Sequence, residues 1–162
     1  MTAVPFGINP FRIGRLRRRY STPLSADPVA GVPVRGGRVS PFNLEVLANS
    51  ASEGPVAMLN LVKYRNREAY GEYGRLTGKL VADHGGRMIW AGTVAEVALE
   101  EGGDTDWDFA AIVLYPNRQA FIDLVTSDQY LDANEIRRKG IVKHVVLAAD
   151  TVQFEDIVRQ SR

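Results

Sequence analysis

The chain has 162 residues, 45% of them hydrophobic, so it can bury the core of one globular domain, and its formal net charge of +1 gives no global field for nucleic acid or an anionic membrane. The absence of cysteine excludes disulfides, thiolate nucleophiles and cysteine metal sites. No apolar run reaches the roughly 18–20 residues that span a bilayer, so we expect a cytoplasmic protein with neither a membrane nor a nucleic acid as partner.

The first 40 residues differ from the rest of the chain. They contain spaced prolines and a basic run at Arg15–Arg19, and their first acidic residue is Asp27. Prolines at this spacing work against the long amphipathic helix of an organelle transit segment. Two interpretations stay open: an extended or flexible arm that packs on a partner subunit, and a disordered basic tail. We therefore divide the chain into an N-terminal arm, residues 1–40, and a folded domain, residues 41–162.

After the arm, helix and strand patterns alternate regularly. Pro41 favours the first turn of a short helix, Asn66 is a plausible N-cap, and Gly85 with Gly86 can close the helix that Asn66 starts. In chain order the pattern predicts a helix at 43–48, a strand at 55–64, a helix from 66 to about 81, a strand at 88–99, a turn at 102–105, a strand at 107–115, a helix at 118–126, a short helical turn after Ser127 and a strand at 141–149.

From residue 55 onward, the order is strand, helix, strand, strand, helix, strand. This order predicts an α+β fold, a ferredoxin-like βαββαβ plait in which the helices cover one face of a four-stranded antiparallel sheet. The other face would be a large exposed apolar surface, and a second copy of the sheet is the simplest cover. We therefore expect a homodimer.

Several short motifs in this order resemble a known family. They are Met58-Leu59-Asn60-Leu61, Gly85-Gly86, Trp90-x-Gly92, Trp107-Asp108 and Tyr115-Pro116-x-Arg118. Over residues 54–149 the chain resembles domain-of-unknown-function family 1330, part of the dimeric α/β-barrel superfamily. The resemblance implies that two sheets close a barrel in a homodimer, and relatives include cofactor-independent monooxygenases, polyketide cyclases, lactone isomerases and haem proteins. The family has no settled activity, and fold analogy does not identify chemistry.

Asn60 is the one polar residue in the apolar run Val56–Val62. A buried amide without partners costs about 1–3 kcal/mol, so Asn60 must bond within the protein or face a cavity. Strand parity separates Ala57, Leu59 and Leu61 from the set that contains Met58, Asn60 and Tyr64. We expect the wholly apolar set under the helices, and Asn60 and Tyr64 in the barrel interior, where they could polarise an oxygen of a ligand. The alternative is that Asn60 only fixes strand register.

Other candidates lie on the later strands. Trp90 and Tyr115 could form flat walls for a ligand. Asp108 could act as a base if burial raised its pKa, although a solvated or arginine-paired carboxylate is the simpler interpretation. His144 lies in the middle of a strand and could act as general acid or base, whereas His84 lies at a helix end, where capping explains it.

Arginines near the second helical region could bind a carboxylate or phosphate, and Arg118, Arg137 and Arg138 lie there with Tyr130 nearby. Their alternative is solvation at the surface. Phosphate-binding glycine loops, a GxSxG elbow and a dinucleotide fingerprint do not occur in the sequence, and two histidines distant in sequence predict no metal site. A haem ligand could come only from His144.

The leading hypothesis is a small cofactor-independent enzyme that acts on an apolar, oxygenated, polyketide-like molecule in the barrel interior by cyclisation, isomerisation or oxygenation. The alternative is a non-catalytic module for small-molecule binding or dimerisation. Nucleic-acid binding through Arg12–Arg19 gains little support from the net charge. The residues expected to carry the chemistry are Asn60, Tyr64, Asp108 and His144, and those expected to bind substrate are Met58, Trp90, Tyr115, Tyr130, Arg118 and Arg138.

Overall fold

A computed structural model describes residues 32–33 and 39–152 of the chain. The elements are β1 (Val32–Pro33), β2 (Val39–Ser40), α1 (Leu44–Ala48), β3 (Val56–Tyr64), α2 (Arg67–Asp83), β4 (Arg87–Thr93), β5 (Phe109–Tyr115), α3 (Arg118–Thr126), α4 (Asp128–Gly140) and β6 (Ile141–Asp150). Most of the predicted arm, including its basic run Arg15–Arg19, lies outside the described residues. No helix in the described part is long and apolar enough to cross a membrane.

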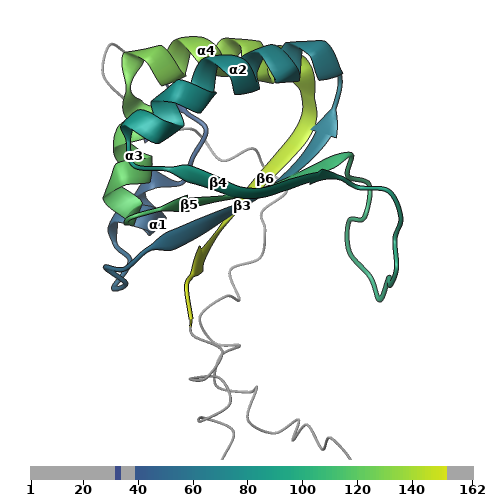
Figure 1. The fold of residues 1–162 in the computed structure, drawn as a ribbon, viewed down its shortest axis with the longest axis horizontal. Coiled ribbons are helices and arrows are strands. Elements are labelled where there is room, and N and C mark those ends of the chain that lie inside the picture. The colour runs from purple at the N-terminus through teal and green to yellow at the C-terminus, as the bar shows by residue number, and fades with distance from the viewer. Residues whose placement is uncertain (1–31, 34–38, 153–162) are drawn as a thin grey trace, which may run out of the picture. The chain divides into compact units, whose positions relative to one another are not determined.

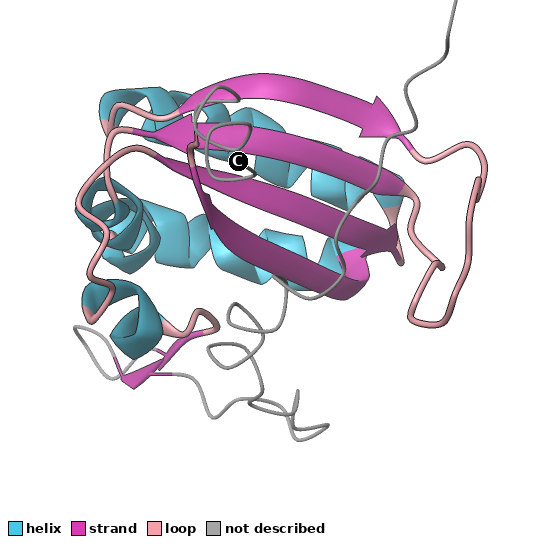
Figure 2. Ribbon diagram, turned by 90° about the horizontal axis from the view of Figure 1, so that it is seen from below, coloured by secondary structure: helices cyan, strands magenta, loops and turns pink. Residues whose placement is uncertain are grey.

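The larger sheet has the strand order β4-β5-β3-β6, and every neighbouring pair is antiparallel. The helices α2 and α4 lie over one face of this sheet, and none of the described helices lies on the opposite face (Figures 1 and 2). Strand β3 lies between β5 and β6, as the split βαβ topology requires. The structure confirms the predicted α+β class and the ferredoxin-like plait.

Asparagine and serine side chains fix where the helices begin. Asn66, Asn117 and Ser127 each accept a hydrogen bond from the backbone N–H three residues further on, at distances of 3.0, 2.9 and 3.2 Å. Helix α2 ends at Asp83, and two residues later Gly85 has a φ of 73°, in the left-handed region that favours glycine after a helix. The predicted start and end of this helix are therefore set by local residues.

Helices α2 and α4 come close together at Gly140. A Cβ at this position would lie 2.7 Å from the backbone nitrogen of Tyr70, so no larger residue fits without a shift. The carbonyl oxygen of Gly140 also accepts the backbone N–H of Arg65 at 2.8 Å. This contact holds the end of α4 against the start of α2.

Two elements differ from the prediction. The second strand ends at Thr93, and residues 94–108 form a long connection instead of a continued strand and tight turn. Lysines hold that connection: Lys63 pairs with Asp106 at 2.6 Å, and Lys143 pairs with Asp104 at 2.6 Å. The helical turn predicted after Ser127 is the thirteen-residue helix α4.

The two faces of β3 are the reverse of the prediction. Val56, Met58 and Val62 are buried, and Val56 and Met58 belong to the core that includes the helical residues Leu124 and Tyr130. The helix-free face instead carries a row in register across the sheet, Trp90, Ile112, Leu59 and Leu147. Both faces are apolar, so alternation of residue type could not assign them, and Asn60 lies on the helix side.

Candidate functional site

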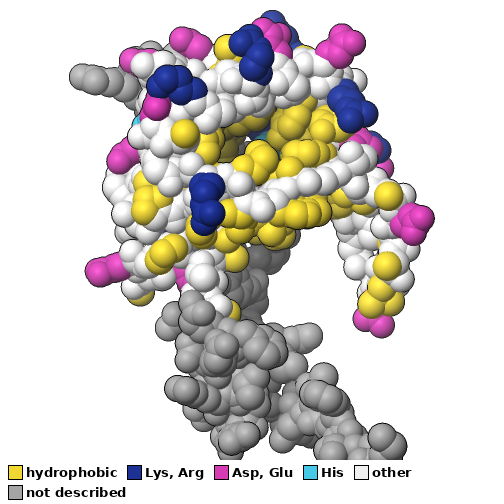
Figure 3. Space-filling model, in the orientation of Figure 1, with side chains coloured by type: hydrophobic (Ala, Val, Ile, Leu, Met, Phe, Trp, Pro, Cys, Tyr) yellow, Lys and Arg dark blue, Asp and Glu magenta, His cyan; other side chains and the backbone are white. Residues whose placement is uncertain are grey.

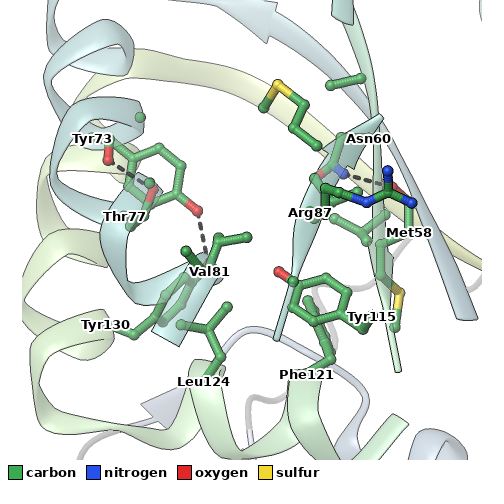
Figure 4. A pocket seen from close by; sticks show the side chains of 18 of the residues that line it. Met58, Asn60, Tyr73, Thr77, Val81, Arg87, Tyr115, Phe121, Leu124 and Tyr130 are labelled. Carbon is green, nitrogen blue, oxygen red and sulfur yellow. Dashed lines mark hydrogen bonds between the residues drawn. The ribbon is translucent and has the colours of Figure 1, made fainter. Parts of the chain in front are cut away.

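A cavity of about 420 Å³ lies between the helical layer and the sheet. In Figure 3, hydrophobic side chains gather around a hollow between α2 and the sheet. Close up, Tyr73, Thr77 and Val81 of α2 face Asn60 and Tyr115 of the sheet across the cavity (Figure 4). The volume lies within the range of about 300–1,000 Å³ that is typical of small-molecule sites.

Two glycines of α2 form part of the cavity wall. Gly74 and Gly78 both line the cavity, and a Cβ added to either would meet nothing within 4 Å. A glycine inside a helix costs roughly 0.5–1 kcal/mol relative to alanine, so each of these positions reduces helix stability. Because glycine has no side chain, these two positions leave open space beside α2.

A chain of hydrogen bonds runs from helix α4 to Asn60. Arg137 Nη1 lies 2.8 Å from His144 Nδ1, and His144 Nε2 lies 3.1 Å from Asn60 Oδ1. Because a guanidinium only donates, Nδ1 must accept, and the imidazole proton is therefore on Nε2, which donates to Asn60 Oδ1. The Asn60 amide nitrogen donates to the carbonyl oxygen of Met58 at 2.9 Å. The orientation of Asn60 is thus fixed from both ends.

His144 is a neutral imidazole in this structure. Burial and the nearby positive charge of Arg137 lower its pKa to about 3. Both ring nitrogens already have protein partners. The predicted role of His144 as an acid or base near neutral pH therefore has no support from its electrostatics.

Arg137 is a buried cation, with 6% of its surface exposed. Its Nε donates to Asn134 Oδ1 at 2.8 Å and its Nη1 to His144. No carboxylate among the described residues forms an ion pair with it. Within the part of the chain that the structure describes, the partners of this positive charge are the neutral side chains of Asn134 and His144.

Four tyrosines add hydroxyl groups to the cavity wall. The hydroxyls of Tyr73 and Tyr130 lie 3.0 Å apart, so one donates to the other. Burial raises the pKa of both, and it also raises the pKa of Tyr70 and Tyr115. All four are neutral hydroxyls that can exchange hydrogen bonds with a ligand but cannot accept a proton as phenolates.

The cavity brings together half of the residues predicted from sequence. Those that line it are Met58, Asn60, Tyr115, Tyr130 and His144. They come from β3, β5, α4 and β6, so the fold collects them from distant parts of the chain. These residues lie between the sheet and the helices and not on the helix-free face, because the faces of β3 are the reverse of the prediction.

The other predicted site residues lie elsewhere. Trp90 is on the helix-free face with 53% of its surface exposed, and its ring covers Gly92 instead of a ligand space. Tyr64 packs its ring 5.4 Å from that of Tyr70 and does not line the cavity. Arg118 donates to Asp150 at 2.7 Å.

Asp108 and Arg138 also fall outside the cavity. A hydrogen bond from the backbone N–H of Tyr64, together with Lys63, lowers the pKa of Asp108, which is the opposite of the rise that a base would need. Arg138 is exposed and lies 3.6 Å from Glu135. The ion-paired alternative was correct for Asp108, although its partner is a lysine.

Sequence reasoning named Arg137 as a possible anion-binding residue, but not as the buried partner of His144. It missed four polar residues of the cavity wall: Tyr70, Tyr73, Thr77 and Arg87. The first three share one helical face with spacings of three and four, and this stripe was a usable signal. No metal-binding group of three or more histidine, aspartate or glutamate side chains occurs in the part of the chain that the structure describes.

Comparisons with known proteins identify a family and solved structures of similar fold. The family model "Domain of unknown function (DUF1330)" matches residues 57–151. A protein of unknown function from Rhodopseudomonas palustris is 29% identical over 65% of this chain and 88% of its own, with a TM-score of 0.60. The same protein in methylated form is 30% identical over 66% of this chain and 87% of its own, with a TM-score of 0.59.

A third structure shows similarity of fold alone. Hydroxynitrile lyase from Passiflora edulis is 17% identical over 64% of this chain and 99% of its own, with a TM-score of 0.50. Comparison with curated proteins gives no match.

Proposed function

Because this chain belongs to the family described as Domain of unknown function (DUF1330), which names no activity, we propose its function from the cavity itself. The protein binds a small, largely apolar, oxygenated molecule between its sheet and its helices. It promotes a cofactor-independent reaction of that molecule, such as cyclisation, isomerisation or oxygenation. The single observation that carries the proposal is the cavity of about 420 Å³, with an apolar wall and a few fixed polar groups.

The polar groups define how the molecule would be held. Met58, Phe109 and Leu124 offer apolar surface, while Asn60 has one amide N–H beyond the bond to Met58. An amide N–H that is already oriented can bind a carbonyl or hydroxyl oxygen without reorganisation. This supports hydrogen bonding and orientation as the means of catalysis, since the wall tyrosines and His144 are neutral.

A first experiment tests binding in the cavity. The probe is a neutral naphthyl ketone whose fluorescence changes in an apolar environment, and the blocking variant is Gly78→Leu. The matched control is Gly71→Leu, at a glycine of the same helix that does not line the cavity and also has open space around it. We expect Gly78→Leu to weaken binding at least tenfold and Gly71→Leu to bind as the wild type does. Equal binding by all three proteins would reject the cavity as the site.

A non-catalytic binding module is the second candidate. It is favoured by one observation. Asn60 and His144 are hydrogen-bonded to each other, and Asn60 also donates to the carbonyl oxygen of Met58, so both side chains have protein partners without a ligand. Small molecules extracted from the purified protein and returned to it separate the two functions. A changed mass, or uptake of oxygen, that is lost in Asn60→Ala and His144→Ala identifies an enzyme. Recovery of the unchanged molecule identifies a binding module.

The helix-free face supports a homodimer as part of the same proposal. Trp90 and Leu147 are 53% and 50% exposed there, in register with Ile112 and Leu59. Such a continuous apolar surface is unusual on a monomer and suits a second copy of the same sheet. The ligand would then lie on the other side of each sheet, one molecule per protomer.

A further inference from the structure

The described wall of the cavity carries positive charge and no negative charge. The titratable or charged residues on its wall come from five elements, α2, β4, β5, α4 and β6, and they are Tyr70, Tyr73, Arg87, Tyr115, Tyr130 and His144. None of the described wall residues is a carboxylate. Arg87 is therefore the one full charge on the described wall, since the tyrosines and His144 are neutral.

A second positive charge acts from behind the wall. Burial raises the pKa of Tyr73 and Tyr130, and the charge of Arg137 opposes that rise in both, so its field reaches the hydroxyl pair. The same charge polarises His144, whose Nε2–H points to Asn60. Hydrogen bonds in such a chain strengthen one another, which makes the free amide N–H of Asn60 a better donor.

The charges have a consequence for what the cavity holds. An ionised oxygen loses hydration free energy in an apolar cavity, and nearby positive charge with oriented donors offsets that loss. A carboxylate on the wall would cancel the effect, and the described wall has none. The buried guanidinium also has no carboxylate of its own among the described residues.

We infer that the cavity takes its ligand as an oxyanion, a phenolate or an enolate, and that Arg137 acts as a positioning residue for this charge through His144 and Asn60. The inference rests on the proposed binding function and narrows its ligand class to oxygen acids of weak acidity. On binding, the O–H proton of the ligand passes to the buffer, and the electron pair stays on the oxygen.

Two probes separate this inference from the proposed function. 4-Nitrophenol ionises near neutral pH, and its coloured phenolate reports its own ionisation when bound. 4-Nitroanisole has the same ring but a methyl ether, so it cannot ionise. We expect both to bind the wild-type protein, and the pKa of bound 4-nitrophenol to be at least one unit lower than in solution, which equals a tenfold preference for the phenolate.

Variants identify the source of the shift. Arg137→Gln should remove most of the lowering in the pKa of bound 4-nitrophenol and leave 4-nitroanisole binding within twofold. Arg138→Gln is the matched control, since Arg138 is the neighbouring but exposed arginine of α4 and should keep the full shift. Asn60→Leu removes the last donor of the chain without uncovering Arg137, and should lose part of the shift even where Arg137→Gln does not fold.

Each outcome decides one question. Failure of both probes to bind overturns the proposed function and this inference with it. Binding of both probes with an unchanged or raised pKa of 4-nitrophenol overturns the inference alone. An equal loss of the shift in Arg137→Gln and Arg138→Gln overturns the role of Arg137.

Discussion

His144 shows how one residue links the site to folding. Its pKa falls from an ordinary value of 6.5 to about 3 because it is buried and lies beside Arg137. Below about pH 6.5 the unfolded chain binds a proton at this residue, whereas the folded chain does so only near pH 3. The unfolded state therefore binds more protons in this window, and stability must fall as the pH falls through it.

We expect the wild-type protein to lose about 2 kcal/mol of unfolding free energy through this residue between pH 7 and pH 5. Urea denaturation at the two pH values measures the loss. His144→Gln keeps a donor toward Asn60 but has no titrating group, so its loss over the same interval should be smaller by about that amount. Identical losses in the two proteins would show that His144 is not held neutral.

For two adjacent arginines of α4, the sequence did not predict which one is buried. The sequence indicated both Arg137 and Arg138 as possible anion-binding residues and placed only Arg138 in the substrate-binding set, but the structure buries Arg137 and exposes Arg138. Neighbouring residues on a helix point about 100° apart, so the direction in which the helix faces, about its own axis, decides which one reaches the interior. That direction comes from packing, including the close contact at Gly140, and not from either arginine.

At the scale of elements, glycines have opposite effects at different places. Gly140 lies where α4 meets the backbone of Tyr70, and an added Cβ would come within 2.7 Å of its nitrogen. Gly71 lies inside α2 with nothing within 4 Å of an added Cβ. The first glycine is required by packing, and the second only lowers helix stability.

Substitution by alanine should separate these two roles. Gly140→Ala should lower the free energy of unfolding by about 1–3 kcal/mol, because neighbouring backbone must move. Gly71→Ala should raise it by about 0.5–1 kcal/mol through helix propensity alone. Chemical denaturation of the two variants beside the wild type measures both changes, and a neutral Gly140→Ala would show that α2 and α4 can separate without cost.

Most element boundaries were predictable because they depend on local chemistry. Asn66 caps the helix that it was expected to start, and the fold class follows from element order. Helix α4 was underestimated because its sequence is rich in polar residues, and Asn134 and Arg137 are buried within it. The prediction of which sheet face carries Asn60 was wrong. Both sides of β3 are apolar, so only tertiary packing decides which side lies under the helices.

At the scale of the whole molecule, the proposed dimer gives a test of the helix-free face. Leu147→Glu places a charge on that face at a half-exposed position, so the monomer should still fold while the dimer dissociates. Analytical ultracentrifugation over a range of concentrations should show a monomer for this variant. Val46→Glu is the control at an exposed apolar position of α1, and it should sediment as the wild type does. A wild-type protein that is monomeric at all concentrations would contradict the dimer.

The glycine positions of α2 have a practical consequence for selectivity. Gly74 and Gly78 stand beside open space, and neither belongs to the hydrogen-bonded chain that ends at Asn60. Alanine, valine or leucine at these positions would therefore reduce the size of molecule that enters, in graded steps, while the polar groups stay in place. Size and chemistry of the accepted molecule are set by separate residues, so a laboratory could change one without redesigning the other.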